Sequence, residues 1–285
     1  MAAVKRKGPV AVLGLGCIGG SLARALVAQD VEVRAWALSA ADRAQAEAAG
    51  IRIMGDDTGR GAAACAGAWV IVVAVPIERY AEASRVAVSA ASSDAVILHA
   101  CGLQRQAALG VDEATHERVL GTHPLAGSHE TGFAASRPDL FVGSTVSVER
   151  RASPDARERA EWLWRVAGAE RVEYRDAETH DRLMAWVSHL PQLASTALAA
   201  TLAGGGIDAR AVGTGARDAT RLAASALGSW PALLRGAPRD LRDALAGLER
   251  AIAELRAALD DDAPAKLEAI WERGRAWRRS GERRA

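Results

Sequence analysis

Three glycines near the start of the chain have the spacing of a turn that can hold a pyrophosphate. In VAVLGLGCIGGSLARAL, residues 10–26, an apolar run precedes Gly14, Gly16 and Gly19, and an Ala/Leu-rich run follows them. In such a turn the first glycine makes the bend, the second lets backbone approach the phosphates, and the third lets a helix pack on the strand. The motif alone is a weak sign, and an apolar hairpin could share it. A strand and a helix on its two sides predict a dinucleotide-binding unit, with the anion at the helix N-terminus.

A histidine at the end of a predicted strand is the first candidate for acid–base chemistry. His123 follows an apolar run and is held by Pro124, in the segment LGTHPLAGSHETGF. Histidine titrates near neutrality and can accept a proton from a hydroxyl group. Ligands of doubly wound α/β folds bind outside the carboxyl ends of the strands, where His123 is expected to lie. The alternative is a loop histidine that caps a strand end.

Two segments of the second half carry further polar groups. His189 and Gln192 lie three residues apart in THDRLMAWVSHLPQ, so they share one face of a predicted helix, which Pro191 should kink. The segment GTGARDATRLAA places Arg217 and Arg221 on either side of an aspartate. An arginine paired with that aspartate would be structural, whereas an unpaired arginine could bind a substrate carboxylate.

The first half of the chain alternates predicted strands and helices. The β-branched run WVIVVAV, residues 69–75, is typical of a strand buried on both faces. Such alternation predicts a mainly parallel sheet with helices on both faces. The predicted strands are 10–13, 31–36, 69–75, 95–99, 119–122, 143–149 and 171–174, and the predicted helices are 19–28, 40–49, 78–90 and 154–167.

Strand signals end near residue 176, and helices are predicted from there on, beginning with a long helix over 177–202. Within 239–259, six apolar side chains recur at alternating steps of four and three, which is the pattern of a seam for another helix. These apolar side chains could pack against another helix of the same domain. A homodimer is favoured, because a small helical domain has little core of its own. The seam residues are Leu241, Leu245, Leu248, Ile252, Leu255 and Leu259.

The predicted fold class is therefore α/β, with an N-terminal Rossmann dinucleotide-binding domain over residues 1–175. A C-terminal all-helical substrate and dimerisation domain is predicted over residues 176–285. The arginine-rich stretch 273–284 is expected to be a solvated, frayed end.

Composition and charge narrow the class of protein. The chain has 285 residues, of which 49% are hydrophobic, and a net charge of +1, which argues against a nucleic-acid or membrane-surface binder. Its three cysteines have no metal-ligand spacing, so reduced thiols and no metal site are expected. Neither a signal peptide nor a run long enough to cross a bilayer is found, which predicts a cytoplasmic protein.

Four motifs together resemble the prephenate/arogenate dehydrogenase family of tyrosine biosynthesis. They are Gly14-x-Gly16-x-x-Gly19-Gly20-Ser21-Leu22, GTHPLAG, HDRLMAWVSHLP and RDATRLAAS, in the order and rough spacing of that family, and they span nearly the whole chain. The resemblance implies oxidative decarboxylation of a cyclohexadienyl carboxylic acid, with hydride transfer to NAD or NADP. It also implies that His123 accepts a hydrogen bond or proton from the substrate hydroxyl, that Arg221 holds a carboxylate, and that His189 lines the pocket. The expected catalytic residues are His123 and His189.

The chain departs from the family pattern at several positions. Ala37 stands where relatives carry an acidic residue for the adenosine ribose, so NADP becomes plausible beside Ser39 and Arg43. Gly102 stands in place of a serine that helps the histidine, and His129 in place of an acidic residue. Gln192 replaces a second histidine, and its amide is compatible with the amino group of arogenate. The expected substrate contacts are Arg221, Gln192, His129 and Gly102, and the expected cofactor contacts are Gly14, Gly16, Cys17, Ile18, Gly19, Ser39, Arg43, Val75 and Pro76.

The motifs leave several functions open. They do not choose between prephenate, arogenate and a modified analogue such as 4-amino-4-deoxyprephenate, nor between NAD and NADP. A second possibility is another two-domain hydroxyacid or imine oxidoreductase, although that chemistry does not require both GTHPLAG and SHLP. A third is an inactive nucleotide-binding regulator, which the lost serine and acidic matches favour and which His123 and Arg221 oppose.

Overall fold

The computed structural model describes residues 8–55, 60–128, 130–228 and 230–282. The chain forms two compact units, residues 1–238 and residues 239–285. In the described ranges, no helix is both long enough and apolar enough to cross a membrane.

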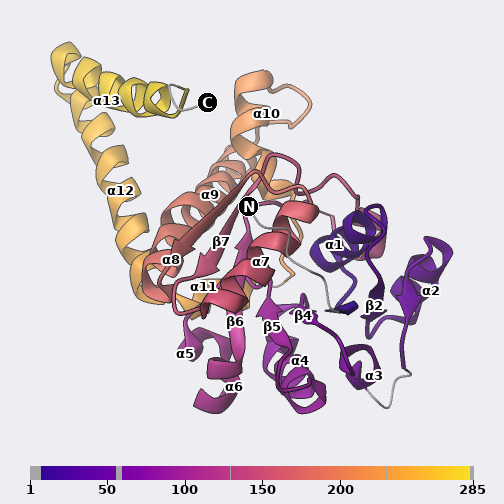
Figure 1. The fold of residues 1–285 in the computed structure, drawn as a ribbon. Helices are drawn as coiled ribbons and strands as arrows, with labels where there is room; N and C mark the ends of the chain where they lie inside the picture. The colour runs from indigo at the N-terminus through magenta and orange to yellow at the C-terminus, as the bar shows by residue number, and fades with distance from the viewer. Residues whose placement is uncertain (1–7, 56–59, 129, 229, 283–285) are drawn as a thin grey trace. The chain divides into compact units, whose positions relative to one another are not determined.

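An eight-stranded sheet with the order β3-β2-β1-β4-β5-β6-β7-β8 forms the centre of the first unit (Figure 1). Neighbouring strands are parallel except for β6 and β7, which are antiparallel. Successive side chains of a strand point to opposite faces, so β1 contributes to two cores. The strands are β1 (Val10–Leu13), β2 (Val33–Trp36), β3 (Arg52–Ile53), β4 (Val70–Val73), β5 (Val96–His99), β6 (Val119–Pro124), β7 (Thr145–Glu149) and β8 (Arg171–Arg175).

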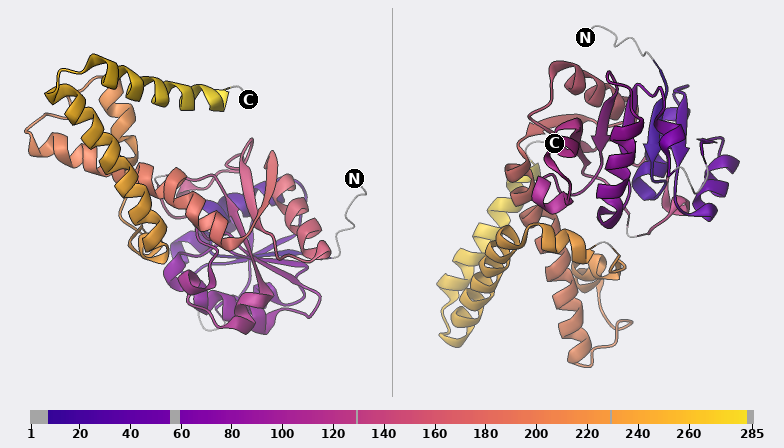
Figure 2. Two further views of the ribbon diagram at one scale, coloured as in Figure 1. Left: turned by 90° about the vertical axis from the view of Figure 1, so that its left-hand side faces the viewer. Right: turned by 90° about the horizontal axis from the view of Figure 1, so that it is seen from below.

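Helices cover both faces of this sheet (Figure 2). Val10 and Val12 belong to the core that includes Leu22 of α1 and Trp164 of α7, whereas Leu13 belongs to the core that includes Tyr80 of α4. Several helices begin at side-chain caps that accept a backbone N–H group, as the sequence of each start requires. The helices are α1 (Cys17–Val27), α2 (Ala40–Ala48), α3 (Ala62–Cys65), α4 (Ile77–Ala90), α5 (Gln106–Leu109), α6 (Glu113–Arg118) and α7 (Pro154–Val166).

Strand β6 is longer than its sequence predicts. The predicted strand ends at Thr122, with His123 immediately after it, and this position for His123 is wrong. In the structure His123 pairs with Ser147 and Pro124 with Val146, so the histidine lies inside β6. The antiparallel partner β7 supplies backbone hydrogen bonds that a parallel arrangement alone would not, and these extend the strand. The short elements β3, α3, α5 and α6 were not predicted.

A series of helices completes the first unit. The helix predicted over 177–202 is interrupted near Pro191, as expected, but the interruption is a π-helical turn, Ala185–His189. Proline has no N–H group and its ring crowds the carbonyl four residues before it, so a wider turn relieves both problems. The elements are α8 (Ala177–Met184), the π-helical turn, α9 (Leu190–Gly204), α10 (Thr214–Thr220), a 3-10 turn (Arg221–Ala224) and α11 (Trp230–Gly236). The predicted domain boundary at residue 176 stays a prediction.

The second unit contains most of α12 (Pro238–Asp260) and all of α13 (Pro264–Glu282). The described part of the arginine-rich end is solvated, as expected, but it is not frayed, because α13 continues to Glu282. Alanine, glutamate and arginine are good helix formers, and Pro264 is suited to a helix start. An ion pair of 2.6 Å between Glu254 and Arg273 joins the two helices.

Candidate active site

The glycine turn between β1 and α1 has the geometry that its sequence predicts. Gly14 has a φ of +97°, which favours glycine, and its N–H donates to the carbonyl of Trp36 at 2.8 Å. A Cβ on Gly19 would lie 1.9 Å from the carbonyl oxygen of Gly14, so only glycine allows this close packing. A Cβ on Gly16, the N-cap of α1, would meet no described atom within 4 Å apart from its chain neighbours. The open space at the helix N-terminus therefore fits a dinucleotide pyrophosphate.

Four further expected cofactor contacts lie beside this turn. Cys17 and Ile18 form the first turn of α1. Val75 and Pro76 lie between β4 and α4, and Val75 Cγ1 is 2.9 Å from the position that a Cβ on Gly14 would take. The structure thus places these residues around one edge of the sheet, at the carboxyl ends of β1 and β4.

Ala37, Ser39 and Arg43 follow the end of β2. Ala37 is buried, and Ser39 caps α2 by accepting the N–H of Asp42 at 3.1 Å. Arg43 Nη1 donates to the carbonyls of Ala37 and Leu38, at 2.6 and 3.0 Å. These two bonds hold the guanidinium beside the end of β2.

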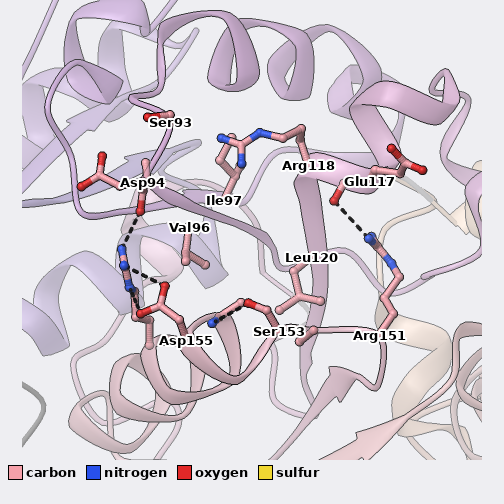
Figure 3. A pocket seen from close by; sticks show the side chains of 14 residues that line it. Ser93, Asp94, Val96, Ile97, Glu117, Arg118, Leu120, Arg151, Ser153 and Asp155 are labelled. Atoms are coloured by element: carbon pink, nitrogen blue, oxygen red, sulfur yellow. Dashed lines mark hydrogen bonds and ion pairs between the residues drawn. The ribbon is translucent and has the colours of Figure 1, made fainter.

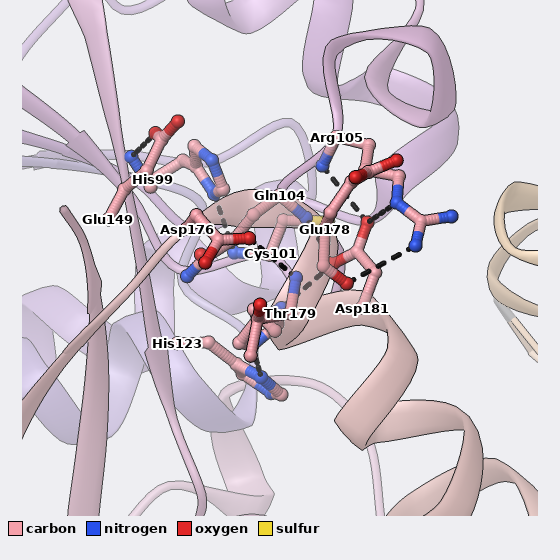
Figure 4. A network of polar contacts seen from close by, with 12 residues as sticks. His99, Cys101, Gln104, Arg105, His123, Glu149, Asp176, Glu178, Thr179 and Asp181 are labelled. Carbon is pink, nitrogen blue, oxygen red and sulfur yellow. Dashed lines mark hydrogen bonds and ion pairs between the residues drawn. The ribbon is translucent and has the colours of Figure 1, made fainter. Parts of the chain in front are cut away.

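His123 is the end of a hydrogen-bonded series of buried side chains (Figure 4). Its Nδ1 lies 3.0 Å from Nε2 of His180, and Nδ1 of His180 lies 2.8 Å from Oδ1 of Asp181. His180 and Asp181 are both fully buried. Asp181 also accepts the backbone N–H groups of Gln104 at 2.8 Å and Arg105 at 3.0 Å. Helix α8 is thereby fastened to the segment after β5 and to the histidine of β6.

The electrostatics of this cluster favour a neutral base. Burial, followed by the neighbouring imidazoles of His180 and His189, lowers the pKa of His123 to about 3. Burial also lowers the pKa of His189. A neutral imidazole has one nitrogen that accepts a hydrogen bond, so His123 can accept a hydrogen bond from a hydroxyl group over the physiological pH range.

Gly102 lies against the other nitrogen of His123. A Cβ on Gly102 would be 3.8 Å from Nε2 and 3.9 Å from Cε1 of His123. The structure therefore brings together two residues that the sequence analysis singled out separately. Because glycine has no side chain, it neither covers Nε2 nor bonds to it.

The predicted residues of the helical segment gather around the turn Arg221–Ala224. Gln192 Nε2 donates to the carbonyl of Leu222 at 2.9 Å, and Ser195 Oγ accepts the N–H of Ala223 at 3.2 Å. Arg221 is exposed at the start of this turn. The amide N–H groups of Gln192 thus fasten the turn that carries Arg221.

His189 lies at the end of the π-helical turn and is 3% exposed. Its ring centroid is 6.0 Å from that of Trp230. Among the residues that the structure describes, its Nδ1 has no hydrogen-bond partner. A buried imidazole nitrogen without a partner can be satisfied by a bound ligand or a water molecule.

Sequence reasoning missed the contact from His180 and Asp181 to His123, and it missed Trp230. The available signal was the position of the His-Asp pair, one turn after the helix cap Asp176. The expected substrate contact His129 lies outside the described residues. Within the described ranges, no group of three or more His, Cys, Asp or Glu side chains could hold a metal ion.

A pocket of about 430 Å³ lies at the opposite, amino-terminal ends of β5 and β6 (Figure 3). Its charged groups are largely engaged within the protein. Arg151 bonds to Glu149 and to backbone carbonyls, and Arg159 pairs with Asp155. The pocket is therefore a weaker candidate for chemistry than the His123 cluster.

Two family models match most of the chain. Residues 22–168 match the family model described as prephenate dehydrogenase, nucleotide-binding domain, and residues 176–272 match that described as prephenate dehydrogenase, dimerization domain. Cyclohexadienyl dehydrogenase of Zymomonas mobilis is 29% identical over 246 residues, which are 80% of this chain and 81% of that protein. Prephenate dehydrogenase of Bacillus subtilis is 24% identical over 237 residues, which are 80% of this chain and 64% of that protein.

The fold is also found in a solved structure. The crystal structure of prephenate dehydrogenase from Aquifex aeolicus, in complex with hydroxyphenyl propionate and NAD+, superposes with a TM-score of 0.85 at 21% identity. The superposition covers 97% of this chain and 99% of that chain. At this level of identity the likeness concerns the fold.

Proposed function

Because this chain belongs to the prephenate dehydrogenase family, we propose that it catalyses the oxidative decarboxylation of prephenate or arogenate. The observation that carries the proposal is His123, a neutral imidazole at the carboxyl-terminal end of β6 whose Nε2 lies beside Gly102. In this proposal the enzyme works in the cytoplasm in the biosynthesis of tyrosine.

The proposed chemistry assigns the proton of the substrate to His123. The O–H proton at ring carbon C4 moves to the imidazole as the C4–H bond releases a hydride. The bond from C1 to the carboxylate then breaks, CO2 leaves, and its electron pair makes the ring a phenolate, which takes the proton back. The nicotinamide dinucleotide, when bound at the β1–α1 turn, supplies the hydride acceptor. Since aromatisation drives the reaction, the protein's main work is positioning and polarising the substrate.

The helical segment supplies the remaining substrate contacts in this proposal. Arg221 binds a substrate carboxylate, and the buried Nδ1 of His189 gains its missing partner from the bound acid. Gln192 serves mainly by holding the Arg221 turn through the carbonyl of Leu222. A contact from His129 stays a prediction from the sequence.

We propose NADP+ as a cofactor at least equal to NAD+. The end of β2 lacks the carboxylate that would repel a 2′-phosphate, and Arg43 is held there by the carbonyls of Ala37 and Leu38. Ser39 lies at the start of the same helix.

We propose a homodimer formed through the helical domain. The match to a dimerisation-domain model supports it, and so does the exposure of two seam side chains of α12, Ile252 at 58% and Leu259 at 68%. Exposed apolar side chains in a helical seam are typical of an association surface.

The test is an absorbance assay at the nicotinamide band, crossing prephenate and arogenate with NAD+ and NADP+. We expect reduction with at least one pair, and His123→Asn should lower turnover by about 10²–10⁴-fold, the usual effect of a positioned acid–base group. Dinucleotide binding by that variant should be unchanged. Arg43→Ala should raise the KM for NADP+ more than that for NAD+.

Two outcomes would contradict the proposal. Absence of reduction with all four pairs, in protein that still binds dinucleotide, would exclude both substrates. Unchanged turnover in His123→Asn would remove this histidine from the reaction.

A further inference from the structure

The proposed reaction uses His123 and leaves the two fully buried groups behind it without a role. His180 and Asp181 are both 0% exposed and lie in series from Nδ1 of His123. Figure 4 labels the two ends of this series, His123 and Asp181. Burying a carboxylate and an imidazole is costly unless their hydrogen bonds are satisfied. The directions of these bonds can be worked out from the carboxylate end.

Asp181 fixes the first proton of the series. Its carboxylate accepts the N–H groups of Gln104 and Arg105, and an ionised carboxylate can only accept. The 2.8 Å contact therefore requires a proton on Nδ1 of His180. A neutral His180 then has an unprotonated Nε2, which accepts the proton on Nδ1 of His123. This leaves Nε2 of His123 unprotonated, on the side of Gly102.

The reverse arrangement would need a protonated His180. The charge of Asp181 is already offset by the guanidinium of Arg105, whose Nε is 3.9 Å from Oδ2, and by two backbone N–H groups. Burial lowers the pKa of His99 and His189 and raises the pKa of the Cys101 thiol to about 12, so these three neighbours supply no negative charge. A second cation in this buried place would have to share the Asp181 carboxylate with Arg105.

We propose that His180 and Asp181 are positioning residues that hold His123 in the tautomer protonated at Nδ1, so that Nε2 is the atom that receives the substrate's proton. This inference rests on the proposed function. Gly102 has no side chain that could bond to Nε2 of His123. Of the two contacts described here, only the bond from Nδ1 to His180 orients the ring. When Nε2 takes up a proton, the bond to His180 becomes charge-assisted and stabilises the imidazolium.

The first test reads the tautomer directly. Long-range 1H–15N spectra of protein labelled at histidine nitrogen distinguish protonated from unprotonated ring nitrogens, and His123→Asn identifies the signals of His123. We expect Nδ1 of His123 to be protonated and Nε2 to be unprotonated at pH 7. A proton on Nε2 in the native protein would overturn the proposal.

The second test uses a matched pair of variants. In His180→Gln the amide oxygen can replace Nε2 as the acceptor, whereas in His180→Leu it cannot. We expect His180→Leu to lower kcat by about 10²-fold, the low end of the effect of an acid–base group, while the KM for dinucleotide changes little. His180→Gln should keep the native tautomer and recover most of the activity.

A double variant separates positioning from a structural role. If His180 acts through His123, His180→Leu should have no further effect on the residual activity of His123→Asn. An equal loss in both backgrounds would overturn the proposal. If His180→Leu does not fold, two measurements still test the proposal. They are the tautomer of His123 in the native protein and the activity that His180→Gln retains. If no substrate pair is turned over, the proposed function fails, while the spectra of native and His180→Gln protein still test the tautomer.

Discussion

Burial lowers the pKa of two histidines, His99 and His123. His99 is 1% exposed, and burial together with the neighbouring imidazoles of His180 and His123 lowers its pKa to about 3. Its Nδ1 accepts the N–H of Cys101 at 3.1 Å, which requires the neutral ring. His123 has a similarly lowered pKa. The folded protein therefore keeps both imidazoles neutral in a range where the unfolded chain binds protons.

This difference predicts acid sensitivity of the fold. Between pH 6.5 and about 3 the unfolded state binds more protons at these histidines than the folded state, so the free energy of unfolding should fall as pH falls below 6.5. His99→Asn keeps an acceptor for the Cys101 N–H but cannot titrate. As pH falls, the free energy of unfolding of this variant should decrease less steeply than that of the native protein. The two slopes should differ by up to about 1.4 kcal/mol per pH unit. Urea unfolding of both proteins at pH 7, 6 and 5 measures this, and equal slopes would contradict it.

The sequence sufficed for the residues that belong to local motifs and failed for those joined by packing. His123 and the three turn glycines follow from their place after apolar runs. The contact between His123 and His180 spans 57 residues of chain, and that between Asp181 and Gln104 spans 77. Such contacts depend on how α8 packs beside β6, which no local pattern specifies.

At the scale of elements, the β1–α1 turn has two glycines with different physical duties. The third glycine serves the packing of helix on strand, since a Cβ there would overlap the carbonyl of Gly14. The second serves the ligand, since a Cβ there would point into open space. Substitution by alanine at Gly16 and at Gly19 should separate ligand binding from helix packing.

We expect Gly16→Ala to leave the melting temperature nearly unchanged and to weaken dinucleotide binding by at least about tenfold, which corresponds to about 1.4 kcal/mol. Gly19→Ala, the matched variant, should lower stability by about 1–3 kcal/mol, the usual cost of overpacking. Thermal unfolding and a dinucleotide titration give both values. A large loss of stability in Gly16→Ala would contradict the assignment.

Elements were predicted well where hydrophobic period and flanking turns agree, as for β1, β4 and α7. The predictions were wrong where a neighbouring strand or helix changes the local structure. The extension of β6 depends on the antiparallel partner β7, and the π-helical turn depends on how α8 and α9 accommodate Pro191. Neither cause is visible in a short window of sequence.

At the scale of the whole molecule, the alternation of strands and helices was enough to predict a mainly parallel sheet with helices on both faces. The compact units are residues 1–238 and 239–285, and the predicted domain boundary at residue 176 stays a prediction. Helices α8–α11 belong to that unit through long-range contacts such as the one between His180 and His123. The seam of α12 leaves apolar side chains exposed, and these side chains are the basis of the proposed homodimer.

We expect the double variant Ile252→Glu, Leu259→Glu to be monomeric in light scattering after gel filtration, and the native protein to be dimeric. Placing carboxylates in an apolar seam costs their desolvation without partners. Arg256→Glu, a change of charge at an exposed site on the same helix, is the control and should stay dimeric. A dimer that survives the double variant would place the interface elsewhere.

The position of His123 within a paired strand separates the acid–base group from the segment that follows it. Strand β6 is bonded to β5 on one side and to β7 on the other, so backbone ladders determine where the imidazole lies. We expect the loop beyond Leu125 to tolerate exchange without displacing His123, the proposed base. A chain of this design can acquire a new substrate by changing a loop, and the proton chemistry is inherited intact.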